Sequence, residues 1–397
     1  MNLPDTLRNQ LGRAQRIAAL FGIAGAVVLG IAFAFGNREQ VMHSYLLAYA
    51  YWVSIPLGCM AILMLHHLTG GWWGYPIRRI LEAGTRTLGA IGLLFLPLLA
   101  GMHRLYPWYG WPHTPEVTHN SNLHFKAIYL TPPLFTVRAV VYFAIWLLLA
   151  HFLNKWSEEQ DRTGDPRLES NFEALSGPGL ILWGLCVTYA SVDWVMSLEP
   201  LWFSTIYGMI FMVVEALIAM AFVIFVLRQL SDHEPISKIV TPSQFNDLGN
   251  LMLAFVMLWA YLGFSQFLII WAGNIKDEIP WYLARAFGGW GAVAAVLIAL
   301  HFAVPFLLLL QRGVKRRLQV LSVVAGMMLV LSLLDVYWLV APAYEKAGPQ
   351  VHWVDLFALI GIGGIWLAVF FAQLQSRALL PLHDPRFKGA LQHEHGD

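Results

Sequence analysis

Ten long apolar runs constrain this chain more than any other feature of its sequence. A transmembrane helix needs about 20 mainly apolar residues to cross the hydrocarbon core of a bilayer. The sequence therefore predicts an all-α integral membrane protein with ten transmembrane helices. The predicted spans lie near residues 17–35, 45–66, 86–103, 138–154, 178–197, 203–227, 248–272, 285–310, 318–340 and 353–374.

The overall composition excludes a soluble fold. Charged residues make up 12% of the chain, about half of the roughly 25% that is usual in soluble proteins. The first apolar run is longer than the core of a signal peptide, so we interpret it as a retained span. The net charge of +1 gives no basic field for nucleic acid. The GIGG stretch at 361–364 predicts close packing between two helices.

The distribution of Lys and Arg predicts the orientation, because positively charged loops stay in the cytoplasm. A cytoplasmic N-terminus places 18 of the 25 Lys and Arg residues on the inner side. The even number of spans then returns the C-terminus to the cytoplasm. The predicted organisation is a cytoplasmic segment 1–16, a transmembrane domain 17–374 with a long outer loop 104–137, and a cytoplasmic tail 375–397.

Ionisable residues inside the predicted spans are the strongest functional signal. Such groups are costly in a membrane and usually mark a function or a charge pair. Counted along the spans, His301 lies towards the cytoplasm, Glu215 near the middle, and Asp193 and Asp335 towards the outside. This series predicts a proton pathway, which Glu199 in an outer turn would extend. The alternative is that each residue pairs with a neighbour and only fixes helix packing.

The turn between the fifth and sixth spans carries two of these carboxylates. Asp193 ends the fifth span, Glu199 lies in the turn, and Pro200 helps to stop one helix and start the next. We expect an outer hairpin whose acidic groups point to an aqueous mouth. Such a mouth suits either a proton exit or a docking edge for a positively charged partner.

Two stretches of the sequence resemble a known family. They are VDWVMSLEPLWFSTIYG at 192–208 and SQFLIIWAGNIKDEIPWYL at 265–283. With the ten-span layout and the length, they resemble the ActF family of NrfD-like membrane subunits over nearly the whole chain. Members of this family belong to alternative complex III, a bacterial quinol:electron acceptor oxidoreductase of respiratory and photosynthetic electron transport.

The resemblance implies a fold and a set of partners. The fold would be two four-helix bundles plus two peripheral helices in the bacterial plasma membrane. A sister NrfD-like ten-helix subunit would lie beside the chain. Multihaem cytochrome c and Fe–S subunits would lie on the outer face and carry the haem c and the clusters. The chain itself would hold no metal and would not be catalytic alone, and menaquinone or another quinone is its candidate small-molecule partner.

Two functions compete within this resemblance, and a third lies outside it. The first is a proton-conducting, energy-coupling subunit that uses the carboxylates and His301. The second is a quinone site in this chain, for which Tyr189, Tyr261 and Gln266 are candidate contacts. The third is a stand-alone secondary transporter, which helices broken near the middle of the membrane would favour.

Overall fold

The structure is a computed structural model that describes residues 4–113, 126–381 and 384. The described residues form helices and no strands. Ten helices among them are long and apolar enough to cross a membrane, which confirms the predicted number of spans. Residues 114–125 of the predicted outer loop and most of the predicted tail lie outside the described residues.

The ten spans are built from single helices and from two interrupted segments. The single helices are α1 (Asp5–Phe35), α2 (Arg38–Thr69), α9 (Pro132–Thr163), α10 (Arg167–Trp194), α11 (Tyr207–Leu230), α12 (Pro242–Gly273), α17 (Leu318–Val340) and α18 (Trp353–Gln375). The third span is built from η1 (Trp72–Gly74), α3 (Tyr75–Thr85), α4 (Leu88–Leu94) and α5 (Leu96–Ala100), and the eighth from α14 (Trp290–Val296), η5 (Leu297–Ala303) and α15 (Val304–Leu310). Short connecting helices are α6 (Met102–Leu105), η2 (Pro107–His113), η3 (Met196–Leu198), η4 (Ile236–Lys238), α13 (Ile279–Ala286), α16 (Arg312–Lys315) and η6 (Ala341–Ala343).

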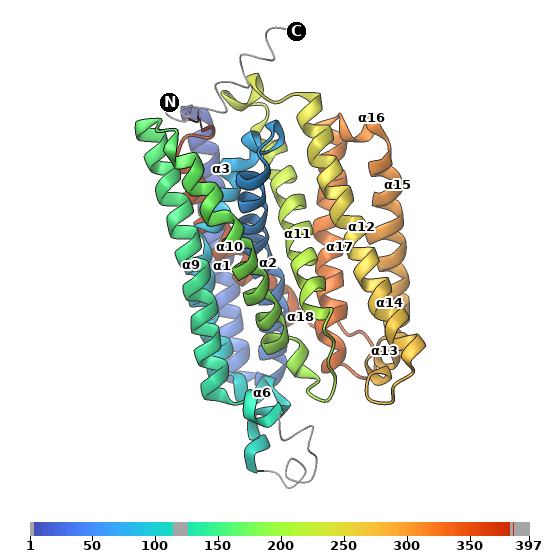
Figure 1. The fold of residues 1–397 in the computed structure, drawn as a ribbon. Coiled ribbons are helices and arrows are strands. Elements are labelled where there is room, and N and C mark those ends of the chain that lie inside the picture. Colours follow the sequence, from blue (N-terminus) through green and yellow to red (C-terminus); the bar gives the residue numbers. More distant parts are fainter. Residues whose placement is uncertain (1–3, 114–125, 382–383, 385–397) are drawn as a thin grey trace.

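The helices run up and down between two ends of the molecule (Figure 1). We call the end at which α1 begins and α18 ends the N face. The opposite end, which holds α6, α13 and the turn between α10 and α11, is the loop face. In Figure 1 the N face is at the top.

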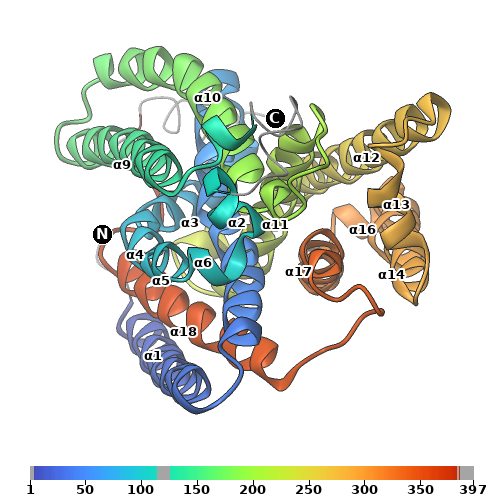
Figure 2. The same cartoon turned by 90° about the horizontal axis from the view of Figure 1, so that it is seen from below.

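The central helices are α2 and α11, which pack against each other and are buried along most of their length. Helix α2 also packs against α3, α10 and α18, while α11 packs against α10, α12 and α17. Helices α1 and α18 pair along one edge of the bundle, as Figure 2 shows from below.

Small residues bring α1 and α18 into backbone contact. A Cβ atom added to Gly22 would lie 2.5 Å from the backbone nitrogen of Ile365, and one added to Gly25 would lie 2.5 Å from the Cα atom of Gly361. Any larger side chain at either glycine would push the helices apart. The close packing predicted from the GIGG stretch is confirmed.

The third span differs most from its prediction. The helical segment begins before the apolar run, so that Arg78, Arg79 and Glu82 lie buried in α3. These residues form ion pairs with one another. A hydropathy profile treats each of them as a separate charged residue, so it predicts that the segment lies outside the span. Pro97 lies in the first turn of α5, where its missing amide hydrogen costs little.

The eighth span contains a π-helical segment, η5, in its middle. Pro305 follows this segment and lacks the amide hydrogen that would bond to the carbonyl of His301 in a regular α-helix. Short π-helical segments are rare and occur frequently at functional sites.

Candidate functional site

The carboxyl group of Glu215 is buried in the protein interior. Glu215 is 4% exposed and lies about 12 Å from the loop-face end of α11. The atom Oε2 has no hydrogen-bond partner among the described residues. Helix α2 approaches closely at this point, since a Cβ atom added to Gly58 would lie 2.0 Å from the carbonyl oxygen of Glu215. The backbones of α2 and α11 are therefore in close contact beside Glu215.

A small cavity of about 20 Å³ borders Glu215 between α2, α10 and α11. This volume is enough for about one water molecule. Three hydroxyl-bearing side chains also line the cavity, those of Tyr49, Ser54 and Ser191. The two serine hydroxyls donate to the carbonyls of Ala50 and Thr188, so each still has lone pairs that can accept. The carboxyl group and one water could exchange a proton here.

A second polar cluster joins α12, η5 and α17. His301 Nε2 lies 3.1 Å from the hydroxyl of Ser332, and the indole nitrogen of Trp259 donates to Asp335 at 3.0 Å. The rings of Trp259 and His301 meet edge to face with centroids 4.5 Å apart. We call these four residues the His301 cluster.

The His301 cluster changes the predicted order of the proton pathway. The sequence placed His301 and Asp335 at opposite ends of the series, whereas in the structure both contact Trp259. His301 contacts Ser332, which lies one helical turn before Asp335 on α17. His301 is therefore only about one turn closer to the N face than Asp335. No hydrogen bond among the described residues links the cluster to Glu215.

Asp193 is paired rather than directed to water. Its two oxygens accept from Nε and Nη2 of Arg138 at 2.8 and 2.9 Å, and the hydroxyl of Tyr142 donates to it at 2.8 Å. Asp193 is 0% exposed, so the expectation that it points into an aqueous mouth is wrong. The physical reason is a bidentate contact with Arg138, which belongs to α9 and is remote in sequence. Its membership of a proton pathway stays a prediction.

Glu199 also has a basic partner. Nη2 of Arg285, from α13, donates to Glu199 at 2.8 Å. The Arg285 guanidinium lies over the ring of Trp281, 3.7 Å from its centroid. Arg285 is buried while the Glu199 side chain is 26% exposed. Glu199 thus lies at a partly wetted edge of the loop face, and its role in proton movement stays a prediction.

Lys126 also contacts the turn between α10 and α11. Its ammonium donates to the carbonyls of Pro200 and Leu201 at 2.9 and 3.3 Å. Burial lowers the pKa of the Lys126 ammonium, and the nearby Asp277 carboxylate acts in the opposite sense. The turn between α10 and α11 is therefore stabilised by contacts with residues that are remote in sequence.

The candidate quinone contacts differ in exposure and in hydrogen bonding, and their role stays a prediction. Tyr189 is 50% and Tyr261 65% exposed on the outer sides of α10 and α12. Gln266 is buried and accepts from Ser204 at 2.9 Å, while its amide nitrogen lies 3.4 Å from the hydroxyl of Tyr282. The two exposed tyrosines take no part in these hydrogen bonds.

Sequence reasoning missed a buried ion network at the N face. Glu82 accepts from Arg78 at 3.0 Å, from Arg79 at 2.7 Å and from the hydroxyl of Ser157 at 2.7 Å. Arg79 also pairs with Asp161 of α9. The signal was the spacing of the two arginines three and four residues before Glu82, which places all three on one helix face.

The described residues contain no group of three or more His, Cys, Asp or Glu side chains arranged to hold a metal ion. Their chemistry is that of buried carboxyl, imidazole and hydroxyl groups, which can move protons. No protein-family model and no curated protein matches this chain.

Proposed function

We propose that this chain is a proton-conducting, energy-coupling membrane subunit of a quinol:electron acceptor oxidoreductase of the alternative complex III type. The observation that carries the proposal is Glu215, a buried carboxyl group with no hydrogen-bond partner for Oε2 and a one-water cavity beside it. A structural carboxylate at this depth would be paired, because an unpaired polar group in a membrane protein interior is costly. A carboxyl group that gains and loses a proton needs a neighbouring proton donor and acceptor, and a water molecule can be both.

The His301 cluster is the second proton-carrying group of the proposed pathway. It places an imidazole, an indole donor, a hydroxyl and a carboxyl group in contact across three helices. The π-helical segment positions His301, and Pro305 leaves the backbone there without one regular hydrogen bond. Groups of this kind in series are typical of proton relays.

The proposed assembly follows from the resemblance and is supported by helix packing. One four-helix bundle would contain α2, the α3–α5 span, α9 and α10, and the other would contain α11, α12, the α14–α15 span and α17. Helices α1 and α18 would be peripheral. The basic residues at the N face support its assignment to the cytoplasm of a bacterial plasma membrane. The haem c, the Fe–S clusters and the quinol-oxidising site would belong to partner subunits.

The decisive test is proton translocation by the reconstituted complex after Glu215→Gln. This change keeps the shape of the side chain and removes the titrating group. We expect proton uptake into liposomes to be lost while quinol oxidation continues. The matched control is Glu39→Gln, which makes the same change at an exposed site in the first turn of α2. An unchanged rate of proton translocation in the Glu215 variant would contradict the proposal.

The partner assignment needs a separate test. The chain is tagged at its C-terminus, purified in mild detergent and analysed by haem absorbance and mass spectrometry. Co-purifying c-type haem, Fe–S protein and a second ten-span subunit would support the complex. A colourless chain without partners would overturn it and make secondary transport the leading function.

A quinone site in this chain is the second candidate function. A groove of about 320 Å³ between α2, α10, α11 and α12 is lined by apolar side chains. Trp183 lines it, and the indole nitrogen of Trp183 has no hydrogen-bond partner among the described residues. The groove suits an isoprenoid tail. The indole nitrogen of Trp183 is itself buried in the wall, so a quinone carbonyl would accept from it only after the side chain turns. Binding of a quinone analogue that weakens in Trp183→Phe would support this candidate, and equal binding would exclude the groove.

A further inference from the structure

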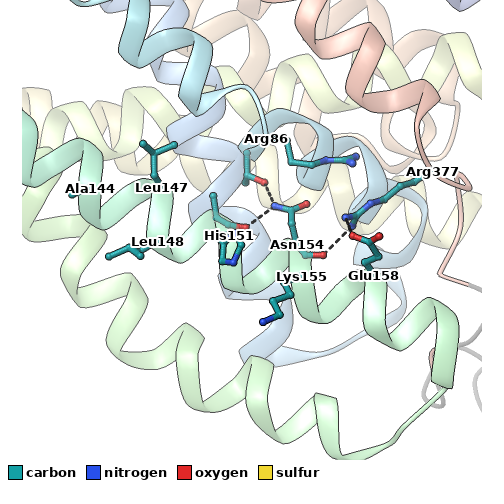
Figure 3. A pocket seen from close by; sticks show the side chains of 11 residues that line it. Arg86, Ala144, Leu147, Leu148, His151, Asn154, Lys155, Glu158 and Arg377 are labelled. Atoms are coloured by element: carbon teal, nitrogen blue, oxygen red, sulfur yellow. Dashed lines mark hydrogen bonds and ion pairs between the residues drawn. The ribbon is translucent and has the colours of Figure 1, made fainter.

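A groove of about 800 Å³ opens at the N face between α9, the turn from α3 to α4 and the end of α18 (Figure 3). Its wall is apolar at one end and charged at the other. The lining residues of the apolar end are Ala144, Leu147 and Leu148, and those of the charged end are Arg86, Lys155, Glu158 and Arg377.

The charged end has more positive than negative side chains. Arg377 donates to Glu158 at 2.9 Å. Within the described part of the chain, Arg86 donates only to neutral groups, the hydroxyl of Ser376 at 3.0 Å and the backbone carbonyls of Gln373 and Glu82. Lys155 is exposed and makes no ion pair with any residue that the structure describes. Two positive charges therefore face the groove without a carboxylate of their own.

The position of the groove along α9 matches the edge of a membrane. Large apolar side chains of α9 are exposed from Leu134 to Phe152. These residues span about 27 Å along the helix, close to the roughly 30 Å of a hydrocarbon core. Lys155 follows Phe152 by about one turn, which places its ammonium at the level of lipid headgroups. Ala144, Leu147 and Leu148 lie at the level of the acyl chains.

We propose that this groove binds an anionic phospholipid. Its phosphodiester would lie between Arg86, Lys155 and Arg377, and one acyl chain would lie along Leu147 and Leu148. Basic pockets between transmembrane helices at the cytoplasmic side bind lipids of this charge. A zwitterionic lipid would bring a second positive charge into an already positive site. A free phosphate would leave the apolar end exposed.

The first experiment measures lipid binding to the purified full-length chain by native mass spectrometry in detergent. The probes are phosphatidylglycerol, phosphatidylcholine and inorganic phosphate. We expect one phosphatidylglycerol to bind in preference to phosphatidylcholine, and Lys155→Gln to weaken that binding about fivefold. The control is Arg162→Gln, which removes a cation from an exposed site on α9, about 10 Å farther along the helix and outside the groove.

A second variant tests the apolar end without changing any charge. Ala144→Trp fills the groove at an exposed position, so the fold should tolerate it. We expect it to weaken phosphatidylglycerol binding as well. Equal binding of the two lipids, equal effects of Lys155→Gln and Arg162→Gln, or full competition by inorganic phosphate would each overturn the lipid assignment.

Discussion

Glu82 at the N face and Glu215 in the centre of the molecule are two buried glutamates with opposite surroundings. Glu82 is 1% and Glu215 4% exposed. Glu82 accepts hydrogen bonds from two arginines and a serine. Glu215 has no ionic partner among the residues that the structure describes, and it borders a cavity. Burial alone therefore says little about the role of a carboxyl group in this protein, and the partners separate a structural carboxylate from a candidate proton carrier.

Asp193 and Asp335 lie between these extremes. Asp193 has a bidentate arginine partner and resembles Glu82. Asp335 accepts from the neutral indole of Trp259 and resembles Glu215 in having no cationic partner among the described residues. Substitutions should therefore change the free energy of unfolding most at Glu82 and least at Glu215.

Glu82→Gln should give the largest loss of stability. The change removes the carboxylate that the two buried arginines share, although Arg78 keeps its pair with Asp384 and Arg79 its pair with Asp161. Breaking a buried ion pair costs roughly 3–5 kcal/mol. The measurement is the free energy of unfolding in detergent. Asp232→Asn serves as control, because this aspartate is 72% exposed and its pair with Arg228 lies at the surface. Similar losses for both variants would contradict the comparison.

Asp193→Asn should cost less, about 1.5–3 kcal/mol for charged hydrogen bonds. Arg138 is partly exposed and keeps its contact with the carbonyl of Tyr129. The same unfolding measurement on Arg138→Gln and on the double variant gives the coupling between the two residues. Additive losses would show that the ion pair does not act as a unit.

Trp259→Phe should cost about 0.5–1.5 kcal/mol, because it removes one donor to Asp335 and keeps an aromatic ring against His301. A matched control is Trp271→Phe, at an exposed position farther along α12. If the His301 cluster carries protons, the Trp259 variant should also slow proton translocation in the reconstituted complex. A normal rate would remove the cluster from the pathway.

Glu215→Gln should change the free energy of unfolding least, by less than about 1 kcal/mol, because no hydrogen bond of the carboxyl group is lost. The same variant should have the largest effect on proton translocation. A loss of stability as large as that of Glu82→Gln would show that Glu215 is a structural carboxylate. Unfolding of both variants in one detergent makes the comparison direct.

Much of the fold follows from local composition. The ten apolar runs and the burial of Glu215 could be predicted because each depends on residues adjacent in sequence. The small residues at 361–364 also predicted close packing, but that α1 is the partner helix did not follow from them. The beginning of the third span could not, since Arg78, Arg79 and Glu82 read as polar residues of a loop. Their burial depends on Ser157 and Asp161 of another helix.

The sequence by itself determined how many helices are long and apolar enough to cross a membrane, because hydropathy is a sum over neighbouring side chains. Only the tertiary structure decided which side chains the buried carboxyl groups have as partners. Arg138 lies 55 residues before Asp193, and Trp259 lies 76 residues before Asp335. Such partners depend on which faces of the helices pack together. The position of a residue along its own span does not contain that information.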